Sequence, residues 1–85
     1  MQPNYLIICR SLTSAQRTAQ ILEHAGIRAA IQRAPRHAAE EGCSHAVRVG
    51  EQQIAKALTL LNRTDLAPSR VFLQQMTGEY REVSL

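Results

Sequence analysis

The residues with the clearest capacity for chemistry are gathered in one stretch, 34–49, which has the sequence APRHAAEEGCSHAVRV. It contains a thiol, Cys43, together with Arg36, His37 and His45, which carry positive charge or exchange protons. A thiolate is a nucleophile, and nearby cations favour the thiolate over the thiol. The composition of the stretch therefore indicates a reactive cysteine. The alternative is that Cys43 is a packed thiol, because free cysteine is among the most buried residue types.

The length and the hydropathy of the chain limit its class. With 85 residues it has room for one domain with a small core. No run of about 18 apolar residues is present, and the N-terminus lacks a basic region followed by an apolar run. We therefore expect no membrane span, no signal peptide and a cytoplasmic location. In that reducing compartment the two cysteines are expected to be thiols, and their spacing indicates no metal or cofactor.

The charge and the aromatic content argue against two classes of function. The formal net charge is +3, and Lys56 is the only lysine among ten basic residues. Small base-stacking modules use exposed aromatics on adjacent strands, and no such pairing is evident here, so no nucleic-acid partner is expected. An independent enzyme is not favoured either, because no acid, base and nucleophile set and no phosphate-binding loop is found.

The elements that would position Cys43 follow from the pattern of apolar residues. Residues 4–10 are apolar on both parities, which is typical of a central strand covered on each face. Thr13 and Gln16 form a capping-box pattern, so we expect a helix to begin there and to end at Gly26. Residues 27–33 alternate and predict a second strand.

The second half of the chain repeats this order. His45, Val47 and Val49 predict a third strand with one apolar face, whose parity Cys43 shares. Residues 54–61 have the spacing of an amphipathic helix, and 70–74 predict a fourth strand. We expect a single domain over 1–76 and a frayed polar tail over 77–85.

This order predicts an α+β fold, the ferredoxin-like βαββαβ plait, in which an antiparallel four-stranded sheet carries two helices on one face. Its usual strand order is fourth, first, third, second. That order brings the end of the first strand with Cys9, the start of the first helix and Cys43 to one edge of the sheet. A helix N-terminus also favours a thiolate, which strengthens the hypothesis for Cys43.

Several short motifs occur in a set order along 4–73. They are the opening strand NYLII, the helix start TSAQ, the turn LEHAGI, the pair Pro35-Arg36 and the step Gly42-Cys43. In these the chain resembles the short bacterial domains of the selenium/sulfur carrier protein-like family. Members of that family typically continue Gly-Cys with another glycine, and here Ser44 takes that place.

The resemblance implies a carrier that holds sulfur or selenium as a persulfide-type adduct on Cys43. It would receive the atom from a cysteine desulfurase-like or other donor enzyme and pass it to an acceptor, as an accessory protein. Arg36 would stabilise the adduct or bind an anionic partner, His37 and His45 would handle protons, and Gly42 and Ser44 would flank the thiol. As alternatives, Arg36 and His37 are solvated loop residues and His45 is a packed strand residue.

Two further hypotheses are open. Cys9 is a candidate resolving thiol for Cys43, although packing within the strand is the interpretation we favour. The alternative function is a small non-catalytic binding or regulatory module that forms a homodimer through its sheet. It is suggested by the doubly apolar first strand and by Ala30 and Ala46, small residues on the face expected to be open.

Overall fold

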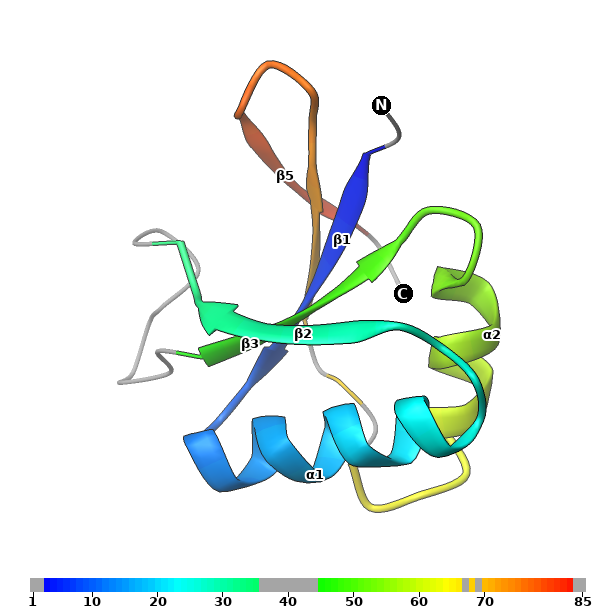
Figure 1. Ribbon diagram of the computed structural model, residues 1–85. Helices are drawn as coiled ribbons and strands as arrows, with labels where there is room; N and C mark the ends of the chain where they lie inside the picture. Colours follow the sequence, from blue (N-terminus) through cyan, green and yellow to red (C-terminus); the bar gives the residue numbers. More distant parts are fainter. Residues whose placement is uncertain (1–2, 36–44, 67, 69, 84–85) are drawn as a thin grey trace.

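The computed structural model describes residues 3–35, 45–66, 68 and 70–83. It confirms the α+β class, with two helices and one antiparallel sheet (Figure 1). The elements in chain order are β1 (Asn4–Cys9), α1 (Leu12–His24), β2 (Ala29–Arg33), β3 (His45–Gly50), α2 (Ile54–Leu61), β4 (Val71–Gln74) and β5 (Tyr80–Val83). Each of the six predicted helices and strands is present, with ends that differ from the prediction by a few residues at most.

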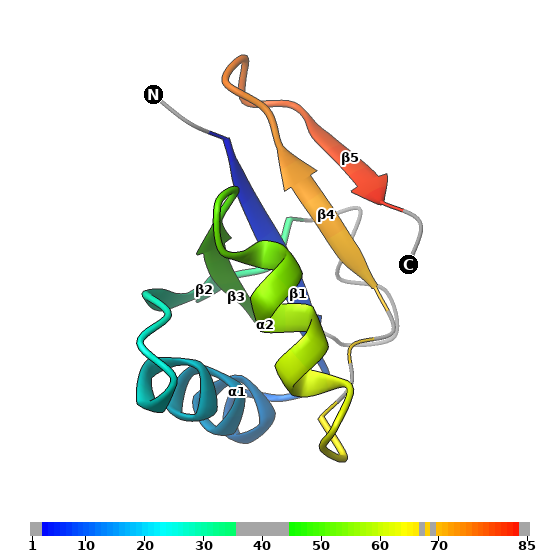
Figure 2. The same cartoon turned by 90° about the vertical axis from the view of Figure 1, so that its right-hand side faces the viewer.

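The sheet has the order β2-β3-β1-β4-β5, and every neighbouring pair is antiparallel. The first four strands therefore have the expected order, with β1 next to β3. The prediction of four strands is wrong, because β5 adds a fifth beside β4 (Figure 2). The ferredoxin-like plait itself remains a prediction.

A tight turn accounts for the unexpected strand. Gly78 has a φ of 92°, a left-handed conformation that glycine adopts without strain. Its N–H donates to the carbonyl of Gln75 at 2.9 Å, and the N–H of Gln75 donates to the carbonyl of Glu79 at 2.8 Å. The turn sets the register that places Tyr80 opposite Gln74 and Val83 opposite Val71. Residues 80–83 therefore form a strand through backbone pairing, without an apolar pattern of their own.

Both helices pack against the same face of the sheet (Figure 2). The buried residues of this core are Ile7, Cys9, Ala15, Ala19, Leu22, Ile27, Val47, Val49, Ala57, Leu61 and Val71. Those from α1 and α2 recur at helical spacing, and those from the strands share one parity, as amphipathic elements require. The core joins both helices to β1, β3 and β4. Neither helix in the described ranges is long and apolar enough to cross a membrane.

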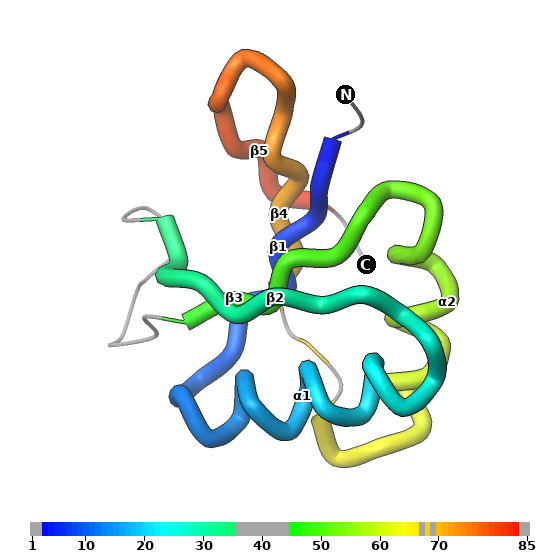
Figure 3. Tube along the Cα trace, viewed as in Figure 1, coloured from blue at the N-terminus to red at the C-terminus, as the bar shows by residue number. Residues whose placement is uncertain are grey.

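The ends of α1 are set by two residues. Ser11 is the N-cap, and its hydroxyl accepts a hydrogen bond from the N–H of Ser14 at 3.1 Å. The helix thus begins earlier than predicted, and Thr13 lies inside its first turn. At the other end Gly26 has a φ of 80°, which confirms the predicted left-handed stop. Figure 3 follows the chain through this turn into β2.

The opposite face of the sheet is also covered at its centre. Leu6, Ile8, Ala46 and Phe72 are buried there, with Ala34 and Tyr80 packed against them. This explains why β1 is apolar on both parities. The expectation that Ala46 lies on an open face is wrong, because its side chain is 0 % exposed.

Candidate functional site

Most of the predicted site lies outside the described residues. This holds for Cys43, Arg36, His37, Gly42 and Ser44. The structure does place Cys9 and His45. It also places Arg33 and Pro35, which precede the predicted site residues in the sequence.

Cys9 is the last residue of β1 and belongs to the core that the helices cover. Its side chain is only 6 % exposed. The thiol donates a hydrogen bond to the carbonyl oxygen of Ile7, with the sulfur 3.5 Å from that oxygen. These contacts are those of a packed thiol, which is the interpretation that the sequence favoured. Its role as a resolving thiol stays a prediction.

His45 is the first residue of β3 and is half-buried. In the register of the sheet it lies opposite Cys9 on one side and opposite Arg33 on the other. A row of opposed residues thus crosses three strands, with Cys9 on β1, His45 on β3 and Arg33 on β2. Arg33 precedes the predicted site residues in the sequence and His45 directly follows them, so the row places these two flanking residues beside the end of β1.

The N-terminus of α1 lies at the same end of the sheet. Only Arg10 and Ser11 separate Cys9 from the first helical residue, Leu12. The structure therefore brings Cys9, His45 and the positive end of the α1 dipole to one edge. The position of Cys43 at this edge stays a prediction.

A pocket of about 230 Å³ opens beside Cys9. The described residues that line it are Ile7, Ile8, Cys9, Arg10, Ser14, Thr18, Asp65, Leu66 and Pro68. No pattern in the sequence predicted this pocket. The sequence pattern that could have indicated it is weak. Ser14 and Thr18 place two hydroxyls one helical turn apart, and Thr18 interrupts the apolar stripe of α1.

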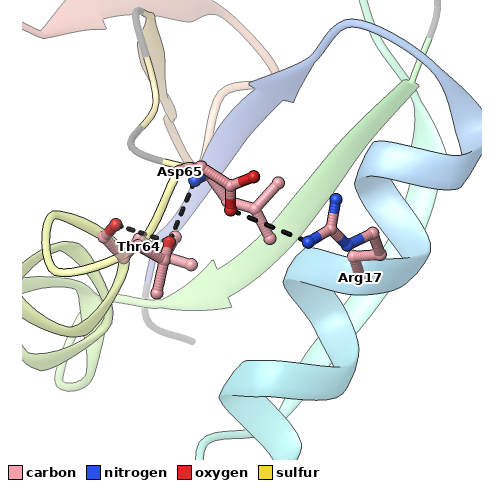
Figure 4. A network of polar contacts seen from close by, with 5 residues as sticks. Arg17, Thr64 and Asp65 are labelled. Atoms are coloured by element: carbon pink, nitrogen blue, oxygen red, sulfur yellow. Dashed lines mark hydrogen bonds and ion pairs between the residues drawn. The ribbon is translucent and has the colours of Figure 1, made fainter.

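The loop after α2 contributes Asp65, Leu66 and Pro68 to the lining of the pocket. Figure 4 shows the polar contacts of this loop at Thr64 and Asp65. The Thr64 hydroxyl donates to the carbonyl of Leu61 at 2.8 Å and accepts from the N–H of Leu66 at 3.0 Å. An oxygen of Asp65 lies 3.7 Å from a guanidinium nitrogen of Arg17 on α1. The local turn holds the loop, and Asp65 is directed toward α1.

No metal centre is found among the described residues, since no group of three or more His, Cys, Asp or Glu side chains there could hold an ion. The described part of the site contains the buried thiol of Cys9, the half-buried imidazole of His45 and a small pocket with the hydroxyl residues Ser14 and Thr18.

Comparisons with known proteins give one result. No curated protein and no solved structure matches the chain. The family described as "Putative Se/S carrier protein-like" matches residues 4–73. The matched part runs from the start of β1 into β4 and takes in both helices and the predicted site. The chain therefore belongs to the Se/S carrier protein-like family, as its motifs predicted.

Proposed function

We propose that this protein is a sulfur or selenium carrier that holds its cargo on Cys43. The observation that carries the proposal is the family match over 4–73. The burial of Cys9 supports the choice of thiol. A carrier must present its sulfur to two partners, and of the two cysteines Cys9 is packed in the core.

The proposed transfer needs no oxidant. The Cys43 thiolate attacks the terminal sulfur of a persulfide on the donor, the sulfur–sulfur bond of the donor breaks, and the donor leaves as a thiolate. A new sulfur–sulfur bond now joins the cargo to Cys43. In the second step a nucleophile on the acceptor attacks the terminal sulfur, and Cys43 leaves as a thiolate. The same sequence applies to a terminal selenium atom.

The residues around Cys43 have proposed roles that follow from their chemistry. Arg36 would pair with the anionic end of the adduct or with an anionic partner, because charge-assisted hydrogen bonds are strong. His37 and His45 would exchange protons with the attacking and leaving groups. Gly42 would let the backbone turn beside the thiol, and the Ser44 hydroxyl would donate a hydrogen bond to the adduct.

The partners belong to the same proposal. The donor would be a cysteine desulfurase-like or other sulfur or selenium donor enzyme, and the transfer would take place in the cytoplasm. We also propose that the first four strands and both helices form a ferredoxin-like plait that presents the 36–44 stretch at one edge.

Intact-mass analysis tests this function. The purified protein is incubated with a cysteine desulfurase and L-cysteine, beside the variants Cys43→Ser and Cys9→Ser. We expect the wild type and Cys9→Ser to gain the mass of one sulfur atom, removable by a thiol reductant, and Cys43→Ser to gain none. An equal gain in all three proteins, or none in any of them, would contradict the proposal.

The alternative function, a module that dimerises through its sheet, loses its main support. It required an open apolar face with Ala30 and Ala46 on it. Leu6, Ile8 and Ala46 are buried within a single chain, whereas Ala30 is half-buried. Homodimerisation itself stays a prediction, which sedimentation at micromolar concentrations would test.

A further inference from the structure

The pocket beside Cys9 presents an unusual set of polar groups for its size. Arg10 provides a positive charge and Asp65 a negative charge, while Ser14 and Thr18 provide hydroxyls. The thiol of Cys9 and the apolar side chains of Ile7 and Leu66 complete the lining. A ligand that satisfies this set needs a negative group, a positive group and a small apolar or sulfur-containing part.

The charge of Asp65 is only weakly paired among the described residues. Its ion pair with Arg17 is long, at 3.7 Å, and the side chains of Arg17 and Asp65 are 56 % and 76 % exposed. Such exposed pairs are weak and exchange readily with other partners. Asp65 can therefore accept a hydrogen bond from a cation in the pocket.

Thr18 gives independent evidence that the pocket takes a polar ligand. It is only 2 % exposed, and among the described residues its hydroxyl makes no hydrogen bond. No fully buried side-chain oxygen in the described ranges lacks a partner. The small exposed part of Thr18 must therefore include its hydroxyl oxygen, at the pocket that Thr18 lines. A nearly buried hydroxyl of this kind favours a ligand that hydrogen-bonds with it.

The volume limits the size of the ligand. At about 230 Å³ the pocket is smaller than the range of roughly 300–1,000 Å³ that holds drug-sized molecules. A single amino acid is of suitable size, and its two charges match those of Arg10 and Asp65.

We propose that this pocket binds a small zwitterionic amino acid that carries sulfur in its side chain, with cysteine as the simplest case. The carboxylate pairs with Arg10 and accepts hydrogen bonds from Ser14 and Thr18, the ammonium group donates to Asp65, and the sulfur lies against Cys9. The binding is non-covalent. The choice of sulfur rests on the proposed carrier function, whereas the zwitterion follows from the lining of the pocket.

An NMR titration with L-cysteine under reducing conditions tests the site, in the full-length Cys43→Ser variant so that Cys43 does not contribute. We expect saturable shifts of the amide signals of Cys9, Ser14, Thr18 and Leu66. A dissociation constant of about 1 mM is reasonable for a ligand of this size. L-alanine should bind more weakly, and ethylamine and propionate, which each lack one charge, more weakly still.

Three variants examine the individual contacts. Thr18→Val keeps the shape of the side chain and should weaken binding about fivefold, the effect of one lost hydrogen bond. Arg10→Gln and Asp65→Asn should each weaken L-cysteine binding by at least that factor. Arg63→Gln and Glu79→Gln are matched controls outside the pocket and should leave the affinity unchanged. The amide NMR signals of the core residues show whether each variant is folded.

The proposal is overturned if L-cysteine gives no saturable shifts up to about 20 mM, far above the expected constant. It is also overturned if ethylamine binds as well as L-cysteine, or if the control variants weaken binding as much as the pocket variants. Binding of L-alanine equal to that of L-cysteine would overturn the preference for sulfur. None of these results depends on sulfur transfer to Cys43, so the pocket can fail while the mass experiment succeeds, and the reverse.

Discussion

Cys9 lies directly opposite His45 in the antiparallel pairing of β1 with β3. Opposed residues in such a pair have α-carbons about 4.5–5.5 Å apart and side chains on the same face. The imidazole thus originates next to a thiol, yet the thiol belongs to the core and is 6 % exposed. Proximity to a histidine alone therefore does not make Cys9 a working nucleophile.

The first prediction concerns thiol reactivity. In the folded protein at neutral pH, iodoacetamide should label Cys43 well before Cys9, because the reagent must reach a sulfur that is packed against α1 and β3. Peptide mass analysis over time measures the two rates. In guanidinium chloride both thiols should react at similar rates, which serves as the control. Faster labelling of Cys9 in the native protein would be incompatible with its packed position.

The second prediction concerns the start of α1. Ser11→Ala removes the oxygen that accepts the Ser14 N–H and should lower the free energy of unfolding by about 1 kcal/mol. Thr13→Ala is the matched control, because Thr13 is exposed within the first turn, and should change stability by less than about 0.5 kcal/mol. Urea denaturation followed by circular dichroism measures both. A larger effect of Thr13→Ala than of Ser11→Ala would instead support the predicted capping box, in which Thr13 is the N-cap.

The third prediction replaces a buried alanine on the sheet. Ala46→Asp places a carboxylate where the side chain is 0 % exposed and should destabilise the monomer by at least about 3 kcal/mol. Ala55→Asp, on the exposed surface of α2, is the control and should be well tolerated. Thermal unfolding compares the two variants. If Ala46→Asp kept full stability and changed only self-association, the dimer hypothesis for this face would regain its support.

The fourth prediction concerns pH and β5. The side chain of Arg70 donates two hydrogen bonds to Glu82 at 3.0 and 3.1 Å. These bonds, aided by the charge of Arg70 and opposed by slight desolvation, lower the pKa of Glu82 below its ordinary value. The stabilising contribution is therefore complete above the ordinary carboxyl pKa and is lost as the pH falls through the lowered value.

Hydrogen exchange of the β5 amides checks this dependence. Protection should decrease in acid for the wild type, and Glu82→Gln should remove that part of the decrease while lowering protection at neutral pH. Glu79→Gln lies in the turn and serves as the control. An unchanged profile in Glu82→Gln would show that the ion pair does not hold the strand.

The sequence predicted the scaffold well because its signals were periodic. The alternation in β3 and the helical spacing in α2 each defined an element within a residue or two. β1 was correctly predicted to be central, since only a strand covered on both faces needs apolar residues on both parities. The family followed from short motifs placed in order on this scaffold.

Other features could not be predicted because they depend on tertiary contacts. The capping-box pattern of Thr13 and Gln16 indicated Thr13 as the cap of α1, but in the structure the cap is Ser11. β5 forms because β4 offers an unpaired edge and Gly78 permits the turn. The pocket is lined by Asp65 from one loop and by Thr18 from α1, which are far apart in the sequence, and no local pattern encodes that arrangement. The predicted site at 36–44 lies outside the described residues, so its roles remain predictions.

The fifth strand also affects how the molecule behaves in concentrated solution. Without it, the hydrogen-bonding edge of β4, with the apolar sequence VFL, would be free to pair with another chain and begin aggregation. β5 occupies that edge, and it is only four residues long, with exposed Arg81 and Glu82. Short charged edges are poor templates for further pairing. Because the family match ends at Leu73, this protection lies in residues beyond the matched part, so a truncated chain ending soon after β4 would be expected to precipitate.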